Sequence, residues 1–168
     1  FSSRATAVSA RTLAIIPFTV HAAEDMAYLA DGTANMLATR IAAGTGVSLI
    51  DPARVRARTA DVDRPLNRAA ALDIGRALNA DYVLFGSITR LGDQFSLDAE
   101  TIDVSGTRAP VAVFEQASSA NAVIPAVNTL AAKIVQRVFS GSSPPPLTPA
   151  TPAPAASRYA HPEKLLDN

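Results

Sequence analysis

The sequence predicts an α/β (mixed α+β) protein with one mixed sheet of about five strands and helices packed on it, in the order β-α-β-α-α-β-β-β-α. Three observations lead to this class. Short β-branched runs alternate with segments of helical apolar spacing in the first half, which favours right-handed crossover connections. The second half carries polar turns between apolar stretches, which is typical of a meander. Beyond residue 139 a proline-rich composition replaces both patterns and predicts an extended tail.

Composition excludes several functional classes. The chain has 168 residues, of which 48% are hydrophobic and 18% are charged, enough for one domain with a core. A formal net charge of zero argues against a nucleic-acid partner. Because cysteine is absent, disulfides, thiolate catalysis and a lipid anchor on cysteine are excluded within this chain. No continuous apolar run approaches the roughly 18 residues that span a bilayer, so we expect no direct membrane span.

The first strands are short. Residues 1–11 form a polar arm without periodicity, and the run from Thr12 to Phe18 predicts a buried strand. Proline cannot donate to a strand ladder, so this strand should end at Pro17 or lie beside an edge there. Residues 47–50 form the second predicted strand.

The first helix is predicted from Glu24 to Ala43 by apolar residues at helical spacing. The Asp31-Gly32 pair interrupts the pattern, so the alternative is a later start with Asp31 as the cap. Gly44 and Gly46 are expected to stop the helix.

Two further helices precede the third strand. Asp51-Pro52 predicts a helix start, because the carboxylate accepts from free amides and proline presets the first turn. After a polar loop at 59–65, apolar residues recur every fourth position from Leu66 to Leu78 and predict a helix. Gly75 is expected to let this helix pack closely on the sheet.

The remaining elements form the meander and the closing helix. Residues 82–89 are a near-continuous apolar run, as in a strand covered on both faces. Residues 95–100 alternate as in a half-exposed strand, and a phase shift at Thr101-Ile102 predicts a bulge. A turn at 105–107 leads to a strand at 111–115 that pairs back. Helical spacing from Val123 to Val138 predicts the last helix, with Pro125 in its first turn.

Residues with catalytic or metal-binding potential are few. His21 with Glu24 and Asp25 could hold a metal ion, but acidic residues at a helix start explain the same pattern. Asp98 and Glu100 resemble an acid/base pair, yet alternation places both on the solvated face of a strand. Gly86-Ser87 lacks the pattern of a nucleophile elbow. We therefore predict no catalytic, cofactor-binding or metal-binding residues, and no enzyme.

Two segments are candidate docking sites. A basic cluster on the second helix is a candidate patch for acidic protein or lipid headgroups, and a solvated helix face is the alternative: Arg54, Arg56 and Arg58. The tail divides into a proline-rich extended part at 140–157 and a docking segment at 158–168. Its predicted partner-binding residues are Pro144, Pro145, Pro146, Pro149, Pro152, Pro154, Tyr159, Leu165 and Leu166.

Four pieces in order carry a family resemblance. They are LAIIPF at 13–18, YLADGT at 28–33, IGRALNADYVLFGS at 74–87 and DVSG at 103–106. Together they cover residues 12–139, and this stretch resembles the amino-terminal α/β domain of the Tol translocation protein family TolB. Domains of curli-secretion and flagellar outer-membrane proteins are loosely similar, although this chain lacks their lipid-anchor cysteine. The resemblance implies a noncatalytic domain that acts through protein contacts in the bacterial envelope.

These observations predict a protein-interaction module, an accessory subunit that its terminal arms hold on a larger complex of other protein subunits, membrane-embedded or not. The alternative is a regulatory or sensory amino-terminal domain of a longer protein whose propeller or repeat domain is missing here. The first residue is Phe1, so either an amino-terminal segment has been removed or the sequence starts late. A cleaved signal peptide fits and predicts a periplasmic or other envelope location outside the cytoplasm.

Overall fold

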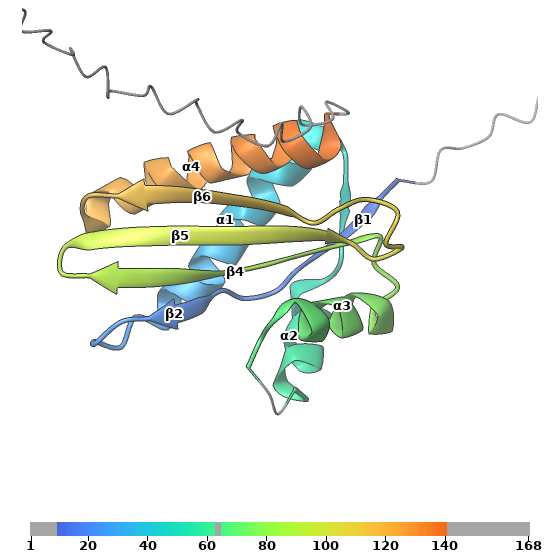
Figure 1. The fold of residues 1–168 in the computed structure, drawn as a ribbon, viewed down its shortest axis with the longest axis horizontal. Coiled ribbons are helices and arrows are strands. Elements are labelled where there is room, and N and C mark those ends of the chain that lie inside the picture. The colour runs from blue at the N-terminus through green and yellow to red at the C-terminus, as the bar shows by residue number, and fades with distance from the viewer. Residues whose placement is uncertain (1–9, 63–64, 141–168) are drawn as a thin grey trace, which may run out of the picture.

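The computed structural model describes residues 10–62 and 65–140 (Figure 1). These residues form a mixed α/β fold, as the sequence predicts. The six strands are β1 (Thr12–Ile15), β2 (Thr19–His21), β3 (Ser48–Leu49), β4 (Tyr82–Leu91), β5 (Gln94–Asp103) and β6 (Val111–Ala117). The helices are α1 (Tyr28–Thr45), α2 (Pro52–Ala60), α3 (Arg68–Ala77) and α4 (Val123–Ile134). A 3-10 turn at Ala120–Ala122 precedes α4, and a π-helical turn at Val135–Phe139 follows it.

The sheet combines parallel and antiparallel pairing. Its strand order is β3-β1-β4-β5-β6, with β2 also pairing with β4. Strands β1 and β2 run parallel to β4, and β3 runs parallel to β1, whereas β5 and β6 form the predicted antiparallel meander. The sequence pattern missed β2, so the observed order begins with two strands rather than one.

The extra strand arises at Pro17. The first strand ends at Ile15, as the missing N–H of proline requires, and the N–H of Phe18 turns away to Ala30 O of α1 at 3.4 Å. Pairing with β4 then resumes, so β1 and β2 pair with successive parts of β4. The predicted strand at Thr12 to Phe18 is therefore shorter than expected and has a continuation.

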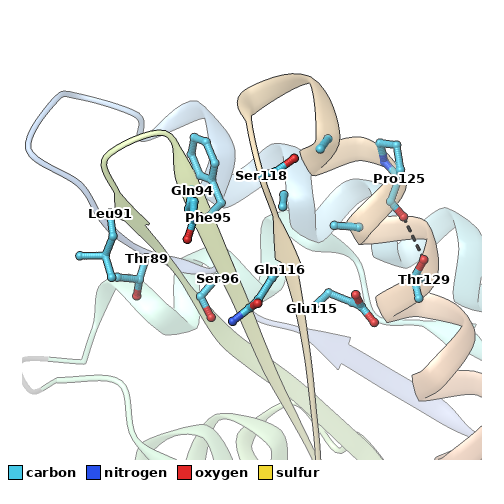
Figure 2. A pocket seen from close by; sticks show the side chains of 13 residues that line it. Thr89, Leu91, Gln94, Phe95, Ser96, Glu115, Gln116, Ser118, Pro125 and Thr129 are labelled. Carbon is cyan, nitrogen blue, oxygen red and sulfur yellow. Dashed lines mark hydrogen bonds between the residues drawn. The ribbon is translucent and has the colours of Figure 1, made fainter.

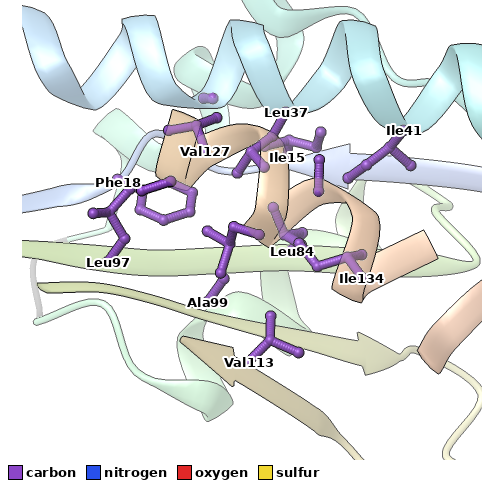
Figure 3. Close-up of a cluster of buried hydrophobic side chains, with 14 of the residues drawn as sticks. Ile15, Phe18, Leu37, Ile41, Leu84, Leu97, Ala99, Val113, Val127 and Ile134 are labelled. Atoms are coloured by element: carbon purple, nitrogen blue, oxygen red, sulfur yellow. The ribbon is translucent and has the colours of Figure 1, made fainter. Parts of the chain in front are cut away.

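Helices cover most of one face of the sheet and a smaller part of the other. Helices α1 and α4 pack on the first face, where Leu37, Leu84, Val127 and Ile134 are fully buried in one core cluster (Figure 3). Helices α2 and α3 form a smaller cluster on the second face. Figure 1 shows these two helices gathered at one end of the sheet, away from most of β5 and β6.

The helix ends follow the predicted capping at some sites and not at others. Asp51 caps α2 by accepting from the Ala53 N–H at 2.8 Å, and Pro52 is its first residue, as predicted. Helix α1 starts late, at Tyr28, but Asp31 lies within its first turn and is not the cap. Gly44 lies inside α1, because only Gly46 adopts the left-handed conformation (φ +66°) that ends the helix.

The β4–β5 pair contains no bulge, which corrects that prediction. The register is continuous from Tyr82 opposite Asp103 to Leu91 opposite Gln94. The phase shift at Thr101-Ile102 has another cause: both residues are buried, and Ile102 packs in the cluster under α2 and α3. The strand is half-exposed along most of its length and covered on both faces only at this end.

Close packing of α3 on the sheet depends on Gly75, as predicted. A Cβ at this position would lie 2.9 Å from Val104 Cγ2 and 3.4 Å from Val83 Cβ. Any larger residue would therefore push α3 away from the sheet.

The closing helical segment has a hydrophobic composition. Ala120–Phe139 is 20 residues long with a mean hydropathy of 1.2, and by length and composition alone it could cross a membrane. In the structure its apolar stripe faces the sheet, with Val127, Leu130 and Ile134 fully buried. Pro125 lies in its first turn, as predicted.

Candidate interaction surface

The uncovered part of the sheet forms a hollow that we call the sheet groove. It crosses β2, β4, β5 and β6 on the face opposite α1 and α4, and Pro65 and Leu66, just before α3, wall one side. Its volume is about 550 Å³. The side chains that define it are His21, Leu66, Phe85, Ser87, Asp98, Glu100 and Phe114.

Two phenylalanines frame the sheet groove. Phe114 on β6 is 62% exposed, whereas Phe85 on β4 is half-buried beside the α2–α3 cluster. Register places Phe85 opposite Glu100 and Phe114 opposite Asp98, so the two acidic residues of β5 lie between the rings. An exposed aromatic ring beside a second apolar wall is a surface suited to a protein or peptide partner.

The acidic residues of the sheet groove differ in their partners. Glu100 pairs with Arg68 of α3, with 2.5 Å between Oε1 and Nε, and this hydrogen bond raises the pKa of Arg68. Asp98 is exposed and accepts from Ser96 Oγ at 3.1 Å. The predicted alternation is confirmed, because both carboxylates lie on the polar face of β5. Because Glu100 is paired with the guanidinium of Arg68, Asp98 and Glu100 are not arranged as a free acid and base.

Gly86 leaves the centre of β4 without a side chain, where there is no space for one. A Cβ there would meet the carbonyl oxygen of Asp98 and, at 2.6 Å, Cε1 of Phe18. Glycine therefore lets the Phe18 ring pack against the strand from the core side. Ser87 lies in the middle of β4, opposite Asp98, which is not the strand-to-helix turn that a nucleophile elbow requires.

The residues weighed as a metal site take other roles. Glu24 pairs with Arg90, with 2.9 Å between Oε2 and Nη1, and Asp25 accepts from the Ala27 N–H at 3.1 Å just before α1. His21 is exposed on β2 at the rim of the sheet groove. Within residues 10–62 and 65–140, no group of three or more histidine, aspartate or glutamate side chains is placed to hold a metal.

The predicted arginine patch is divided. All three arginines are exposed on α2, but Arg56 reaches Asp31 of α1, with 3.5 Å between Nε and Oδ1. Arg54 and Arg58 lie one helical turn apart and so share a side of α2. The predicted binding residues of the tail, from Pro144 to Leu166, lie outside the described residues.

A second hollow lies at the β4–β5 hairpin, between β6 and the start of α4 (Figure 2). It has a volume of about 490 Å³, and its lining mixes uncharged polar side chains with apolar ones. Its one carboxylate, Glu115, forms an ion pair with Lys133 of α4. Lys133 also donates to Phe114 O at 3.2 Å, so it occupies an outward-facing carbonyl of edge strand β6.

Sequence reasoning missed both hollows. For the sheet groove one signal was present: Phe114 is out of phase with Val111 and Val113, which point to the α1–α4 core. Alternation alone would place an aromatic ring on the opposite face of β6.

Comparison with known proteins bears on the fold. No protein-family model matches the chain, and no curated protein matches it. Among solved structures it resembles a single-substitution variant of the PelC dodecamer from Paraburkholderia phytofirmans at 17% identity, over 75% of this chain and 87% of that one (TM-score 0.50). It also resembles Escherichia coli LpoB at 16% identity, over 61% of this chain and 54% of that one (TM-score 0.50). TolB from Acinetobacter baumannii matches at 17% identity, over 76% of this chain and 28% of that one (TM-score 0.48).

Proposed function

We propose that this chain is a noncatalytic protein-interaction module, an accessory subunit of an assembly in the bacterial envelope, outside the cytoplasm. The observation that carries the proposal is the sheet groove, where Phe114 is exposed on a sheet face that α2 and α3 leave open. The TolB-family resemblance of residues 12–139 agrees with this function, since it implies action through protein contacts.

The physical argument starts from desolvation. An exposed phenylalanine gains roughly 1.5–3 kcal/mol when a partner covers it, and aromatic residues near the centre of an interface often dominate binding. The carboxylate of Asp98 places a negative charge beside the ring, which favours a partner of complementary charge and fixes its orientation. The sheet groove therefore supplies both an apolar anchor and a charge that selects partners.

The terminal arms complete the proposed subunit. We assign to residues 1–11 and 140–168 the role of fastening the chain to its assembly, with the proline-rich part as the spacer. Ser140 itself belongs to the folded part, because its N–H and Oγ both donate to Val135 O, at 3.0 and 3.1 Å. A chain that ends at Ser140 should fold like the full chain and assemble more weakly.

The test is migration in a native gel of gently solubilised membranes from the native source, followed by mass spectrometry. We expect the full chain to comigrate with a large complex and the Phe114→Ser variant to leave it. The control is Leu91→Ser, which removes a side chain that is 74% exposed but lies outside the sheet groove. Migration of the unaltered chain as a free species near 17.4 kDa would reject the subunit, whereas recovery of a longer protein that contains this sequence would favour the regulatory domain.

A further inference from the structure

We propose that the sheet groove is a binding site for a polyproline-type segment, and that residues 146–152 of this chain occupy it intramolecularly in the free protein. This inference rests on the proposed function only in using the same surface. It gives the groove a ligand class, and it gives the proline-rich segment a first binding site.

The lining of the groove suits this ligand. Polyproline segments dock in grooves lined by aromatic side chains, because proline rings stack on them and the extended helix loses little entropy on binding. Phe85 and Phe114 supply the rings, and Pro65 and Leu66 supply an apolar wall. Ser87 and Asp98 between the rings offer polar atoms close to the exposed carbonyls and amides of such a segment.

The spacing of the rings matches the spacing of the prolines. Phe85 and Phe114 lie two strands apart and are offset by two residues, which places their Cα atoms about 12 Å apart. A polyproline helix advances about 9 Å per three-residue turn, roughly 3 Å less than the distance between the two Cα atoms. The two phenylalanine side chains can cover this remaining distance by leaning toward each other. Pro146, Pro149 and Pro152 recur at three-residue intervals and therefore lie on one edge of such a helix.

The segment can reach the groove of its own domain. The rings of Phe139 and Tyr82 are in edge contact at 5.3 Å, which places the end of the folded part beside the start of β4. Phe85 lies three residues further along that strand, roughly 10 Å away, although on the other face. The 6 residues from Ser140 to Pro146 would span roughly 19 Å in polyproline conformation, and the 12 residues to Pro152 roughly 37 Å. These lengths exceed the roughly 10 Å along β4 combined with the roughly 10 Å spacing of a packed layer on the sheet.

The test uses the full chain and its lack of cysteine. A single Ser157→Cys substitution carries a nitroxide label, and amide signals of the folded part are recorded by NMR with the label active and reduced. We expect the signals of Ser87, Asp98 and Phe114 to lose most of their intensity, while those of α1, on the opposite face, keep theirs. The same loss must appear when labelled chains are diluted with unlabelled, isotopically silent ones.

Two matched variants separate recognition from proximity. Replacing Pro146, Pro149 and Pro152 with alanine should restore the groove signals, whereas replacing the off-phase set Pro144, Pro145 and Pro154 should not. Phe114→Ser should restore them as well, and Leu91→Ser should not.

Three outcomes would overturn the inference: no signal loss, equal effects of the two proline sets, or a loss seen only between different molecules. The last would assign the segment to a neighbouring copy. None of these results depends on the native-gel experiment. If Phe114→Ser still abolishes comigration, the proposed function stands without the inference. If comigration is unaffected while the groove signals are lost, the inference stands alone.

Discussion

The substitution Gly86→Ala adds one methyl group at the centre of β4, where the structure leaves no space for it. The new Cβ would meet the carbonyl oxygen of Asp98 on β5 and would lie 2.6 Å from Cε1 of Phe18. The first contact is with backbone, which a ten-residue antiparallel register holds in place. Phe18 is 2% exposed and packed in the main core, so its ring has no free direction in which to move.

The expected effect follows from these contacts. Overpacking in a core typically costs about 1–3 kcal/mol, and backbone displacement puts this site at the upper end. The gain from restricting the unfolded chain is about 0.5–1 kcal/mol and offsets only part of it. We expect a net loss of about 2–3 kcal/mol in the free energy of unfolding, or a fall of roughly 10 °C in Tm.

Urea unfolding followed by far-ultraviolet circular dichroism measures this loss directly. The matched control is Gly32→Ala, because a Cβ at Gly32 meets nothing within 4 Å and the residue lies inside α1. That variant should be stabilised by about 0.5–1 kcal/mol. A Gly86→Ala protein within about 0.5 kcal/mol of the unaltered chain, on the order of a neutral surface change, would refute the packing described around β4.

Three further substitutions test other parts of the fold. Thr33 is fully buried, and its Oγ1 has no hydrogen-bond partner among the described residues. Thr33→Val should therefore raise the free energy of unfolding, measured by urea, by about 1 kcal/mol. A lower free energy of unfolding would contradict the unpaired hydroxyl. Burial acts to raise the pKa of Asp103, but hydrogen bonds from Ser105, Thr107 and Arg108 outweigh it and lower the pKa. The stabilisation by this carboxylate is therefore present above its unfolded pKa near 4 and is lost as pH falls through the lower folded pKa. Asp103→Asn should lower the free energy of unfolding by about 1–3 kcal/mol at pH 7 and by little near pH 2. Equal losses at both pH values would exclude this role. Asp51→Ala removes the cap of α2 and should cost about 1 kcal/mol by thermal unfolding, with an unchanged Tm as the contrary result.

The sequence predicted those elements whose signals are local. Asp51-Pro52 carries both its acceptor and its preset turn within two residues, and the four-residue recurrence from Leu66 to Leu78 can only suit a helix. The meander was equally accessible, because alternation on β5 is strict over six residues. Strand β2 was not, since three residues are too few to show a period and its pairing depends on β4, far along the chain.

Apart from the phase of Phe114, the sequence held no signal of the sheet groove, for a related reason. Phe85 and Phe114 are 29 positions apart and become neighbours only through the register of β5. Whether the face between them is open depends on how much of it α2 and α3 cover, which no periodicity records. In the arginine patch, a spacing of two residues turns Arg56 away from Arg54 and Arg58, toward Asp31, and binding by these arginines stays a prediction.

Hydrogen bonds between Thr12, the first residue of β1, and Asp81, just before β4, have a consequence for how the chain folds. The Thr12 N–H donates to Asp81 Oδ2 at 2.8 Å across 69 residues of sequence, whereas β4 and β5 are joined by a tight turn at Gly92. Closing the long loop carries a larger entropic cost than closing the hairpin, so contacts within residues 82–138 should form first. We expect destabilising changes at Gly92 to slow folding and those at Asp81 to speed unfolding, so that the two ends of β4 serve different stages of one kinetic sequence.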